Sequence, residues 1–167
     1  MIASARVAVA DEGGGISGLT PLLLGLCLLL GALVIDINAI RVQRLRFGDA
    51  LEQAAVVAAG QIDAPYLSAS GEIRLATDAT TVAREYLRRN LQPLNGQIAE
   101  SSAAAVAASA QIAVTASGDA DPIRNRIVAA PTVSIRAEIP VNTGLLRLAG
   151  LPAIRALPIT ASATTRS

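Results

Sequence analysis

The side chains that come closest to a ligand-binding set are those of Asp119 and Asp121, in a loop that ends at Pro122. Carboxylates at alternate positions begin a calcium-binding loop, but the remaining oxygen ligands do not follow at the spacing that such a loop needs. The sequence has no histidine, so its serines have no partner for a Ser-His-Asp arrangement. We therefore expect a solvated turn here, no metal, no cofactor and no enzymatic activity.

The glycine cluster and the single cysteine do not have the neighbouring residues that a binding or catalytic site would need. Gly13, Gly14 and Gly15 follow no predicted strand and precede an apolar segment, which argues against a phosphate-binding loop. Cys27 is the only cysteine in the sequence and lies in that apolar segment, where we expect it to pack as a small apolar side chain. The net charge of only +1 argues against a nucleic-acid partner. No small-molecule substrate is expected.

The apolar segment itself is long enough to cross a membrane. Residues 13–35 are 23 residues without a charge, and about 20 residues at about 1.5 Å each span the bilayer core of about 30 Å. A cleaved signal peptide would have a small-x-small site after this segment, and residues 36–41 offer none. We predict a flank at residues 1–12 and an uncleaved transmembrane anchor at residues 13–40.

The start of the anchor helix has two interpretations. Thr20 and Pro21 suit an N-cap and the first helical position, and the helix must then continue to about Arg41 to span the membrane. Alternatively, the helix begins near Gly13 and is kinked by Pro21, which membrane helices tolerate. The sequence leaves both open.

Small residues recur along the anchor, mostly at a spacing of seven. Such a face lets a neighbouring helix approach closely, and a Gly-x-x-x-Gly pair at its start strengthens the pattern. We interpret it as a helix-packing seam, and the alternative is chance in a segment rich in glycine and alanine. The seam consists of Gly14, Gly18, Gly25, Ala32 and Ala39.

The apolar segment closes with an acidic residue, Asp36, and Arg41 follows shortly after it. An ionisable side chain at the margin of a membrane is costly unless it reaches the interface, pairs or faces another protein. Asp36 either marks the membrane interface or contacts another subunit by pairing with an arginine or a free amine. Asp36 and Arg41 are therefore the candidate contact residues.

The helix is expected to continue beyond the membrane as a soluble extension, residues 41–62. Residues 41–61 contain no proline and are dominated by helix formers. Apolar residues at spacings of four, three and four form an amphipathic stripe, and Gly60 ends the helix. The stripe consists of Phe47, Leu51, Ala54 and Ala58.

Residues 63–167 are expected to form a small domain, which makes the fold class α+β: a long helix packed on a small antiparallel sheet with one further helix. Alternation of apolar and polar residues predicts one buried and one solvated face for its best strand, residues 132–141. Residues 97–110 are either strand or helix, and residues 143–151 either cover the core or touch a membrane or partner. The other expected elements are a loop at 65–71, a short strand at 72–75, a helix at 79–91, strands at 111–117 and 157–165, and a loop at 118–122.

Three segments resemble TadE/TadG-like proteins of the tight-adherence (Flp-type) pilus machinery, in their short actinobacterial form. They are Asp11-Glu12-Gly13-Gly14, Val34-Ile35-Asp36 and the alanine-rich residues 49–59, with a tail match at Ile139-Pro140-Val141 and residues 159–164. The resemblance implies a pilin-like membrane protein that acts by helix–helix and protein–protein contacts. Its implied partners are the lipid bilayer and other pilus or secretion subunits, including copies of itself.

Two features bear on processing and topology. The resemblance implies a glutamate five residues after a processing glycine, and Gly18, Leu19 and Thr20 occupy the candidate positions, so the uncut, TadG-like form is expected. Three arginines follow the anchor within residues 41–46 and one precedes it, which by the positive-inside rule places the domain in the cytoplasm. The resemblance implies the opposite, and we expect the domain outside the cytoplasm, anchored in the cell membrane or incorporated in a surface pilus.

A second function remains open, that of a membrane-tethered extracytoplasmic module that binds cell-wall polymer or protein outside any pilus. Aromatic side chains commonly stack on sugars, and this chain has only Phe47, Tyr66 and Tyr86. The structural role in a pilus or secretion system is therefore the leading hypothesis.

Overall fold

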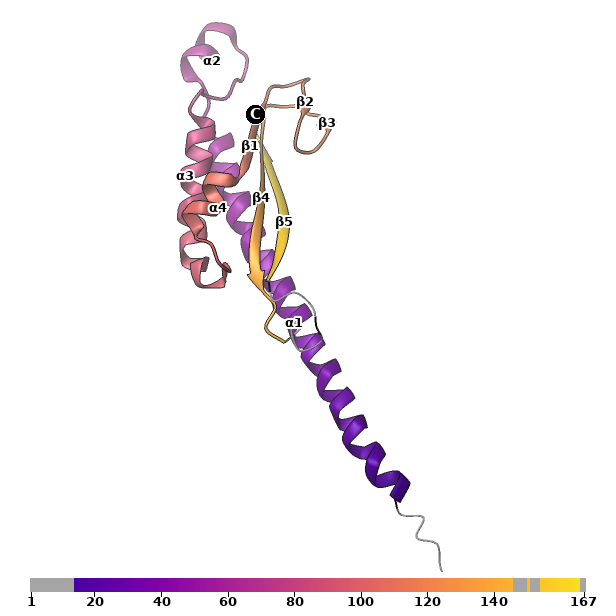
Figure 1. Ribbon diagram of the computed structural model, residues 1–167. Coiled ribbons are helices and arrows are strands. Elements are labelled where there is room, and N and C mark those ends of the chain that lie inside the picture. The colour runs from indigo at the N-terminus through magenta and orange to yellow at the C-terminus, as the bar shows by residue number, and fades with distance from the viewer. Residues whose placement is uncertain (1–13, 146–149, 151–153, 166–167) are drawn as a thin grey trace, which may run out of the picture.

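The structure is a computed structural model of the 167-residue chain, and it describes residues 14–145, 150 and 154–165. One long helix, α1 (Gly14–Ala59), lies with its second half against a head that contains further helices and a small antiparallel sheet (Figure 1). The first half of α1 extends away from the head. The predicted α+β class, a long N-terminal helix packed on an antiparallel sheet, is confirmed.

Helix α1 has 46 residues and contains Pro21, so it has the second of the two predicted starts. Its length is about 69 Å at about 1.5 Å per residue, roughly twice the thickness of a bilayer core. The helix ends as predicted at Gly60, whose N–H donates to the carbonyl of Val56 at 3.1 Å.

Three strands form the main sheet, in the order β1 (Gln111–Thr115), β4 (Thr132–Asn142) and β5 (Ile154–Thr164). Both pairs are antiparallel, and the β4–β5 register runs from Thr132 opposite Thr164 to Asn142 opposite Ile154. The three main strands that the sequence predicts are thus present. Strand β5 is an edge strand, because within the described chain only β4 pairs with it.

The core lies between α1, α3 (Ala79–Leu91) and the inner face of the sheet. Helix α3 has the bounds that the sequence predicts, and Ala83 and Leu87 on its inner side are fully buried. Small side chains on both helices let their backbones approach closely. The stripe of α1 is also completely buried, with Phe47, Leu51, Ala54 and Ala58 each at 0% exposure.

Strand β4 differs from the prediction on its outer face. Its inner residues are buried as expected, from Val133 to Val141. Thr132 and Ser134 on the other face, predicted to be solvated, are buried as well. The reason is the loop that carries Asp121, whose carboxylate accepts a hydrogen bond from the Ser134 hydroxyl.

Residues 118–122 are also more ordered than the predicted loop. They include the two-residue strand β2 (Ala120–Asp121), which pairs with β3 (Arg126–Ile127). The Asp121 carboxylate accepts from the backbone N–H of Ile123 at 2.8 Å, so it caps this turn from within. The aspartate thus has a structural partner for each of its oxygens, which the sequence pattern did not indicate.

The predicted loop at residues 65–71 is wrong, because helix α2 (Ala64–Ser70) occupies it. Asp63 accepts from the backbone N–H of Tyr66 at the start of this helix, and Gly71 ends it with a φ of 74°. Glycine reaches that left-handed conformation without the steric cost that other residues incur. The predicted strand at 72–75 is wrong too, since only an isolated bridge joins Ile62 and Leu75.

Residues 97–110, which the sequence left undecided, contain the short helix α4 (Ala103–Ser109). Ser102 caps it by accepting from the N–H of Ala105 at 3.2 Å. A 3-10 helix, η1 (Gln92–Gln97), joins α3 to this region. The head therefore has three α-helices among its described residues where the sequence predicted one.

The two faces of α1 predict different costs for the same substitution. Leu51 is 0% exposed and Leu45 is 68% exposed. We expect Leu51→Ala to lower the free energy of unfolding by about 2–5 kcal/mol, because it removes buried contacts and leaves a cavity. Leu45→Ala should change it by less than about 0.5 kcal/mol. Urea unfolding of the full chain in detergent, followed by circular dichroism, measures both, and equal effects would contradict the burial of this stripe.

Candidate interaction surfaces

The N-terminal half of α1 is apolar and largely exposed with respect to the described part of the chain. Leu22 and Leu28 are 69% and 67% exposed, and this half is long and apolar enough to cross a membrane. An apolar helix with so little protein contact is suited to lipid or to contact with other helices. Membrane location is thus compatible with the structure of this segment.

The predicted seam lies in this uncovered half. Around Gly25, apart from its chain neighbours and the adjacent backbone of α1, no atom of the described chain lies within 4 Å of where a Cβ would be, and Ala39 is exposed. Ala32 is half-buried. Gly14 and Gly18 belong to the first turns of α1, where the surroundings of the side chains lie outside the described residues. The described head does not fill the seam at Gly25.

Asp36 has a partner that the sequence did not suggest. It is only 6% exposed, although its neighbours Ile35 and Ile37 are 61% and 41% exposed. Its Oδ2 accepts a hydrogen bond from the backbone N–H of Leu145 at 2.7 Å, from a residue 109 positions away. This bond holds the chain that leaves β4 against α1 at the point where the helix leaves the head.

The sequence also predicted a contact at Arg41 and an apolar connector at residues 143–151, both near this point. Arg41 is exposed and lies on the side of α1 that faces β5. None of the ion pairs of the described chain joins it to Asp36. The connector at residues 143–151 lies largely outside the described residues. Of its described part, Thr143 is buried and Leu145 is half-buried.

An open groove runs between α1 and the edge strand β5, with a volume of about 670 Å³. On the helix it is lined by two arginines and two carboxylates, Arg41, Arg44, Asp49 and Glu52. On the strand it is lined by residues 159–162. The sequence analysis missed this groove, because its second wall comes from a strand more than a hundred residues away whose position in the sheet no local pattern gives.

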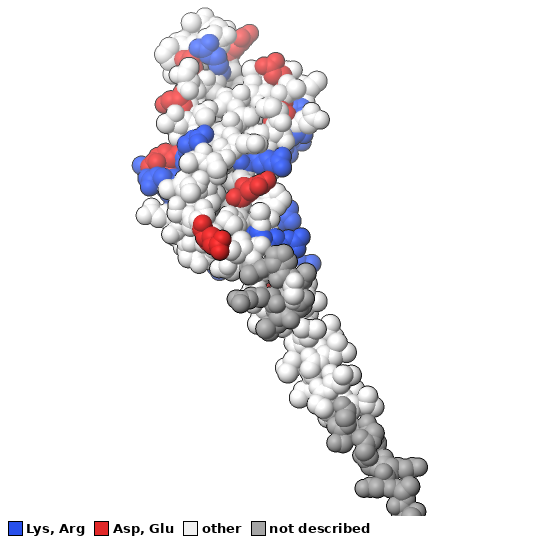
Figure 2. All heavy atoms as spheres, viewed as in Figure 1, with Lys and Arg blue, Asp and Glu red and all other residues white. Residues whose placement is uncertain are grey.

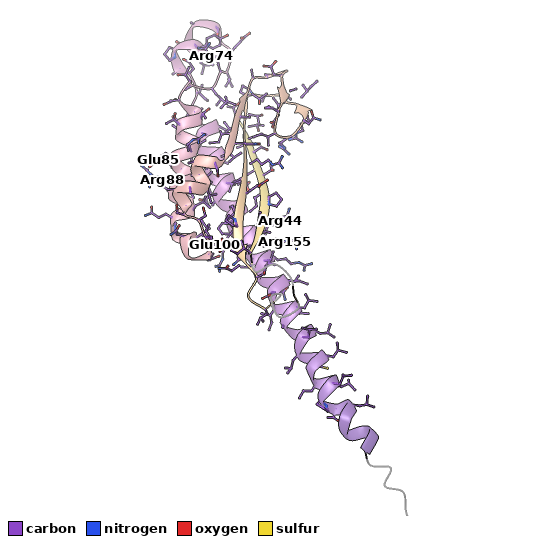
Figure 3. The ribbon with its side chains drawn as sticks, viewed as in Figure 1. Arg44, Arg74, Glu85, Arg88, Glu100 and Arg155 are labelled. Atoms are coloured by element: carbon purple, nitrogen blue, oxygen red, sulfur yellow. The ribbon has the colours of Figure 1, made fainter. Side chains whose placement is uncertain are left out.

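The charged side chains of this groove are not used in ion pairs within the described chain, where the ion pairs are those of Arg74 with Asp63 and of Glu85 with Arg88 and Arg89. Basic side chains gather at the base of the head, where α1 emerges (Figure 2). Arg44 of α1 and Arg155 of β5 are labelled in this part of the molecule (Figure 3). The base of the head therefore presents positive charge beside the apolar half of α1.

Elsewhere the charges stabilise the head. Hydrogen bonds from Arg88 and Arg89 lower the pKa of Glu85 to about 2. Because the folded-state pKa lies below the ordinary value of 4.5, this contribution to stability is present above about pH 4.5 and is lost as the pH falls towards 2. Glu85 lies three and four residues before its partners, the spacing that joins side chains on one helix face.

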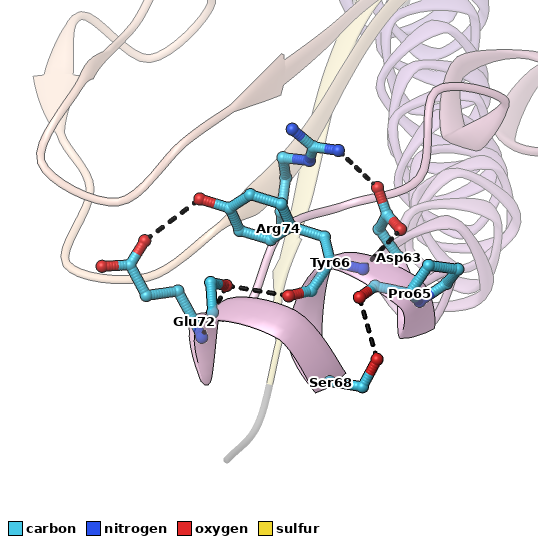
Figure 4. A network of polar contacts seen from close by, with 7 residues as sticks. Asp63, Pro65, Tyr66, Ser68, Glu72 and Arg74 are labelled. Carbon is cyan, nitrogen blue, oxygen red and sulfur yellow. Dashed lines mark hydrogen bonds and ion pairs between the residues drawn. The ribbon is translucent and has the colours of Figure 1, made fainter.

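A second polar network closes the end of the head around α2 (Figure 4). Arg74 donates to Asp63 at 2.6 Å and lies over the ring of Tyr66, and the Tyr66 hydroxyl donates to Glu72 at 3.2 Å. The hydrogen bonds from Arg74 and from the backbone of Tyr66 lower the pKa of Asp63. These contacts fix a local turn and leave no unpaired group there that suggests a ligand.

The pKa of Asp121 reflects opposing effects. Burial raises it, but hydrogen bonds from Ser134 and from the backbone N–H groups of Ile123 and Arg124 outweigh burial and lower it. Among the described residues, no group of three His, Cys, Asp or Glu side chains is arranged to hold a metal ion. Asp121 is fully buried, and its carboxylate holds the turn after β2 to the outer face of β4.

No protein-family model matches the chain, and neither the curated proteins nor the solved structures include a detectably similar one.

The bond between Asp36 and Leu145 predicts how the base of the head opens. In Asp36→Ala the Leu145 amide loses its acceptor, and a hydrogen bond to a charged group contributes about 1.5–3 kcal/mol. We expect hydrogen exchange at Leu145 to speed up about tenfold or more in the full chain in detergent. Asp36→Asn is the matched control, because its amide oxygen can still accept, and its effect should be smaller. Unchanged exchange in the alanine variant would show that the bond does not hold the connector.

Proposed function

We propose that this protein is a membrane-anchored structural or accessory subunit, pilin-like or TadG-like, of a tight-adherence type pilus or a related secretion system. One observation carries the proposal: α1 is continuous from an apolar half that is exposed in the described structure to a half that forms part of the core of the head. A helix of this kind links a membrane, or a bundle of helices, to a small folded domain.

The division of α1 supports an anchor that stays attached to the head. Phe47 and Leu51 are completely buried in the head, so removal of the helix would expose the core. Leu22 and Leu28 remain exposed on the other half, and burial of such side chains contributes about 25 cal/mol per Å² of apolar area. Lipid or neighbouring helices supply that burial in the proposed role.

The head supports a role in contacts between proteins. Four charged side chains of α1 line the open groove, and the edge strand β5 flanks it. The seam on α1 gives a second surface, on which glycine and alanine allow helices to approach closely. The resemblance to TadE/TadG-like proteins, carried by residues 11–14, 34–36 and 49–59, favours an assembly outside the cytoplasm.

Cross-linking within the membrane tests this function. Cys27 is first replaced in Cys27→Ser, and Gly25→Cys then places a single thiol in the seam. We expect oxidation of native membranes to give disulfide-linked multimers of the full-length protein, because the seam brings neighbouring helices together. Leu23→Cys, on nearly the opposite side of the helix at about 100° per residue, is the matched control and should stay monomeric.

Recovery of monomer alone from the Gly25→Cys membranes would count against assembly through α1. Equal cross-linking of the two variants would show random collision and not a seam. A shortened, water-soluble protein would count against the anchor itself.

A further inference from the structure

The exposed face of α1 carries its charges in a regular order. Arg41 and Arg44 come first, and Asp49 and Glu52 follow, all lining the groove beside β5. Neither arginine has a carboxylate three or four residues after it, since those positions hold Arg44, Leu45, Phe47 and Gly48. Helix α3 shows the contrast, because Glu85 there has arginines at both spacings and pairs with them.

The spacing between the two charged pairs is constant. Arg41 precedes Asp49 by eight residues, and Arg44 precedes Glu52 by eight residues. Eight residues correspond to about 12 Å along a helix and to about 80° around it. The two arginines and the two carboxylates thus lie on neighbouring surfaces of α1, displaced along the axis, and no ion pair joins them within the described chain.

Apolar and small residues repeat the same displacement. Ile37 precedes Leu45 by eight residues, and both are exposed, at 41% and 68%. Gly48 precedes Val56 by eight residues. Apart from the chain neighbours of Gly48 and the adjacent backbone of α1, no atom of the described chain lies within 4 Å of where a Cβ would be at Gly48, and Val56 is 55% exposed. Two surfaces with spacings of four, three and four result: Ile37, Arg41, Arg44 and Gly48 form the basic surface, and Leu45, Asp49, Glu52 and Val56 form the acidic surface.

Membrane anchoring restricts how two copies can meet. Copies held by the same apolar segment run in the same direction, so an unshifted contact places arginines level with arginines and carboxylates level with carboxylates. A displacement of eight residues instead places the basic pair of one copy level with the acidic pair of the other. It also places Leu45 level with Ile37, and Val56 level with the space above Gly48.

We propose that a second copy of this chain docks in parallel on α1, displaced by eight residues, so that the basic surface of one copy contacts the acidic surface of the other. This inference rests on the proposed membrane-anchored assembly and names its partner and its axial register.

In this contact the charges mainly determine the axial displacement between the two copies and contribute less to the free energy of association. Exposed ion pairs contribute about 0.2–1 kcal/mol each, whereas facing like charges oppose association. Burial of Leu45 and Val56 supplies apolar area that the isolated chain leaves in solvent. Specificity for the displaced arrangement therefore comes from charge, and attraction comes largely from apolar burial.

The contact joins two different surfaces and is head-to-tail. Each pairing leaves the basic surface of one copy and the acidic surface of the other unused. Further copies can then add at both ends, which gives an open filament unless the rotation between successive subunits closes a ring. The seam lies about 140° around α1 from the centre of either charged surface, at about 100° per residue, so it does not compete for the same surface.

Cysteine pairs test the register without altering any charge. Gly48→Cys and Val56→Cys are made separately in the Cys27→Ser background and are then co-expressed as two distinguishable full-length chains. We expect a disulfide-linked heterodimer between the two chains in native membranes or assemblies, at least about tenfold more abundant than homodimers of either variant. Predominant homodimers would show an unshifted contact and overturn the proposal.

Charge reversal in the same chains tests the cause of the register. We expect Arg44→Glu or Glu52→Arg alone, introduced in both chains, to reduce heterodimer yield about fivefold or more, and the double reversal to restore it. Glu138→Arg, on the exposed outer face of β4, is the matched control and should leave the yield unchanged. A single reversal without effect, or a double reversal that does not restore the yield, would contradict the proposed pairing.

The two proposals fail in distinguishable ways. If Gly25→Cys still forms multimers while the Gly48→Cys and Val56→Cys chains do not cross-link to each other, assembly stands and the register is wrong. If neither site gives multimers, both the assembly and the register are wrong.

Discussion

The continuity of α1 is the constraint on which the rest of the structure depends. All the backbone hydrogen bonds of a helix lie within the segment itself, so a helix can pass from lipid to water without leaving polar groups unpaired. The side chains of α1 then decide where each half lies. Leu22 and Leu28 find no cover on the head, whereas Phe47 and Leu51 are completely enclosed by it.

The head is built around that second half with small side chains. Alanines such as Ala54 and Ala58 on α1 and Ala79 and Ala83 on α3 are all fully buried. Alanine buries little area per residue, so the stability of such a core depends on close approach of the helices and on a complete sheet face. Polar contacts outside the core, including the bond from Ser134 to Asp121, close the outer side of the sheet.

Those parts of the fold that depend on local pattern could be predicted from the sequence. The 3.6-residue period gave α3 and the buried stripe of α1, and the strict alternation from Val133 to Val141 gave β4. Helix α2 was missed although its signals are local, an aspartate cap at Asp63 and a left-handed glycine at Gly71. Its lack of buried residues removed the apolar period on which a helix prediction relies.

Other features depend on contacts between distant parts of the chain, and no local pattern could supply them. The bond between Asp36 and Leu145 joins residues 109 positions apart. The burial of Thr132 and Ser134 requires a covering loop, and the groove beside α1 requires β5 at the sheet edge. The charges of that groove were visible in the sequence, but their shared surface was not.

A cysteine accessibility scan along α1 tests the central claim most directly. Single cysteines in the Cys27→Ser background, from residue 22 to residue 58, are treated with a membrane-impermeant maleimide in open native membranes. The structure and the proposed anchor together predict protection at residues 22–35, labelling at the exposed positions Val42, Arg46 and Gln53, and protection again at Leu51 and Ala54. Uniform labelling of residues 22–35, or labelling beyond Asp36 without helical periodicity, would contradict a single helix shared between membrane and head.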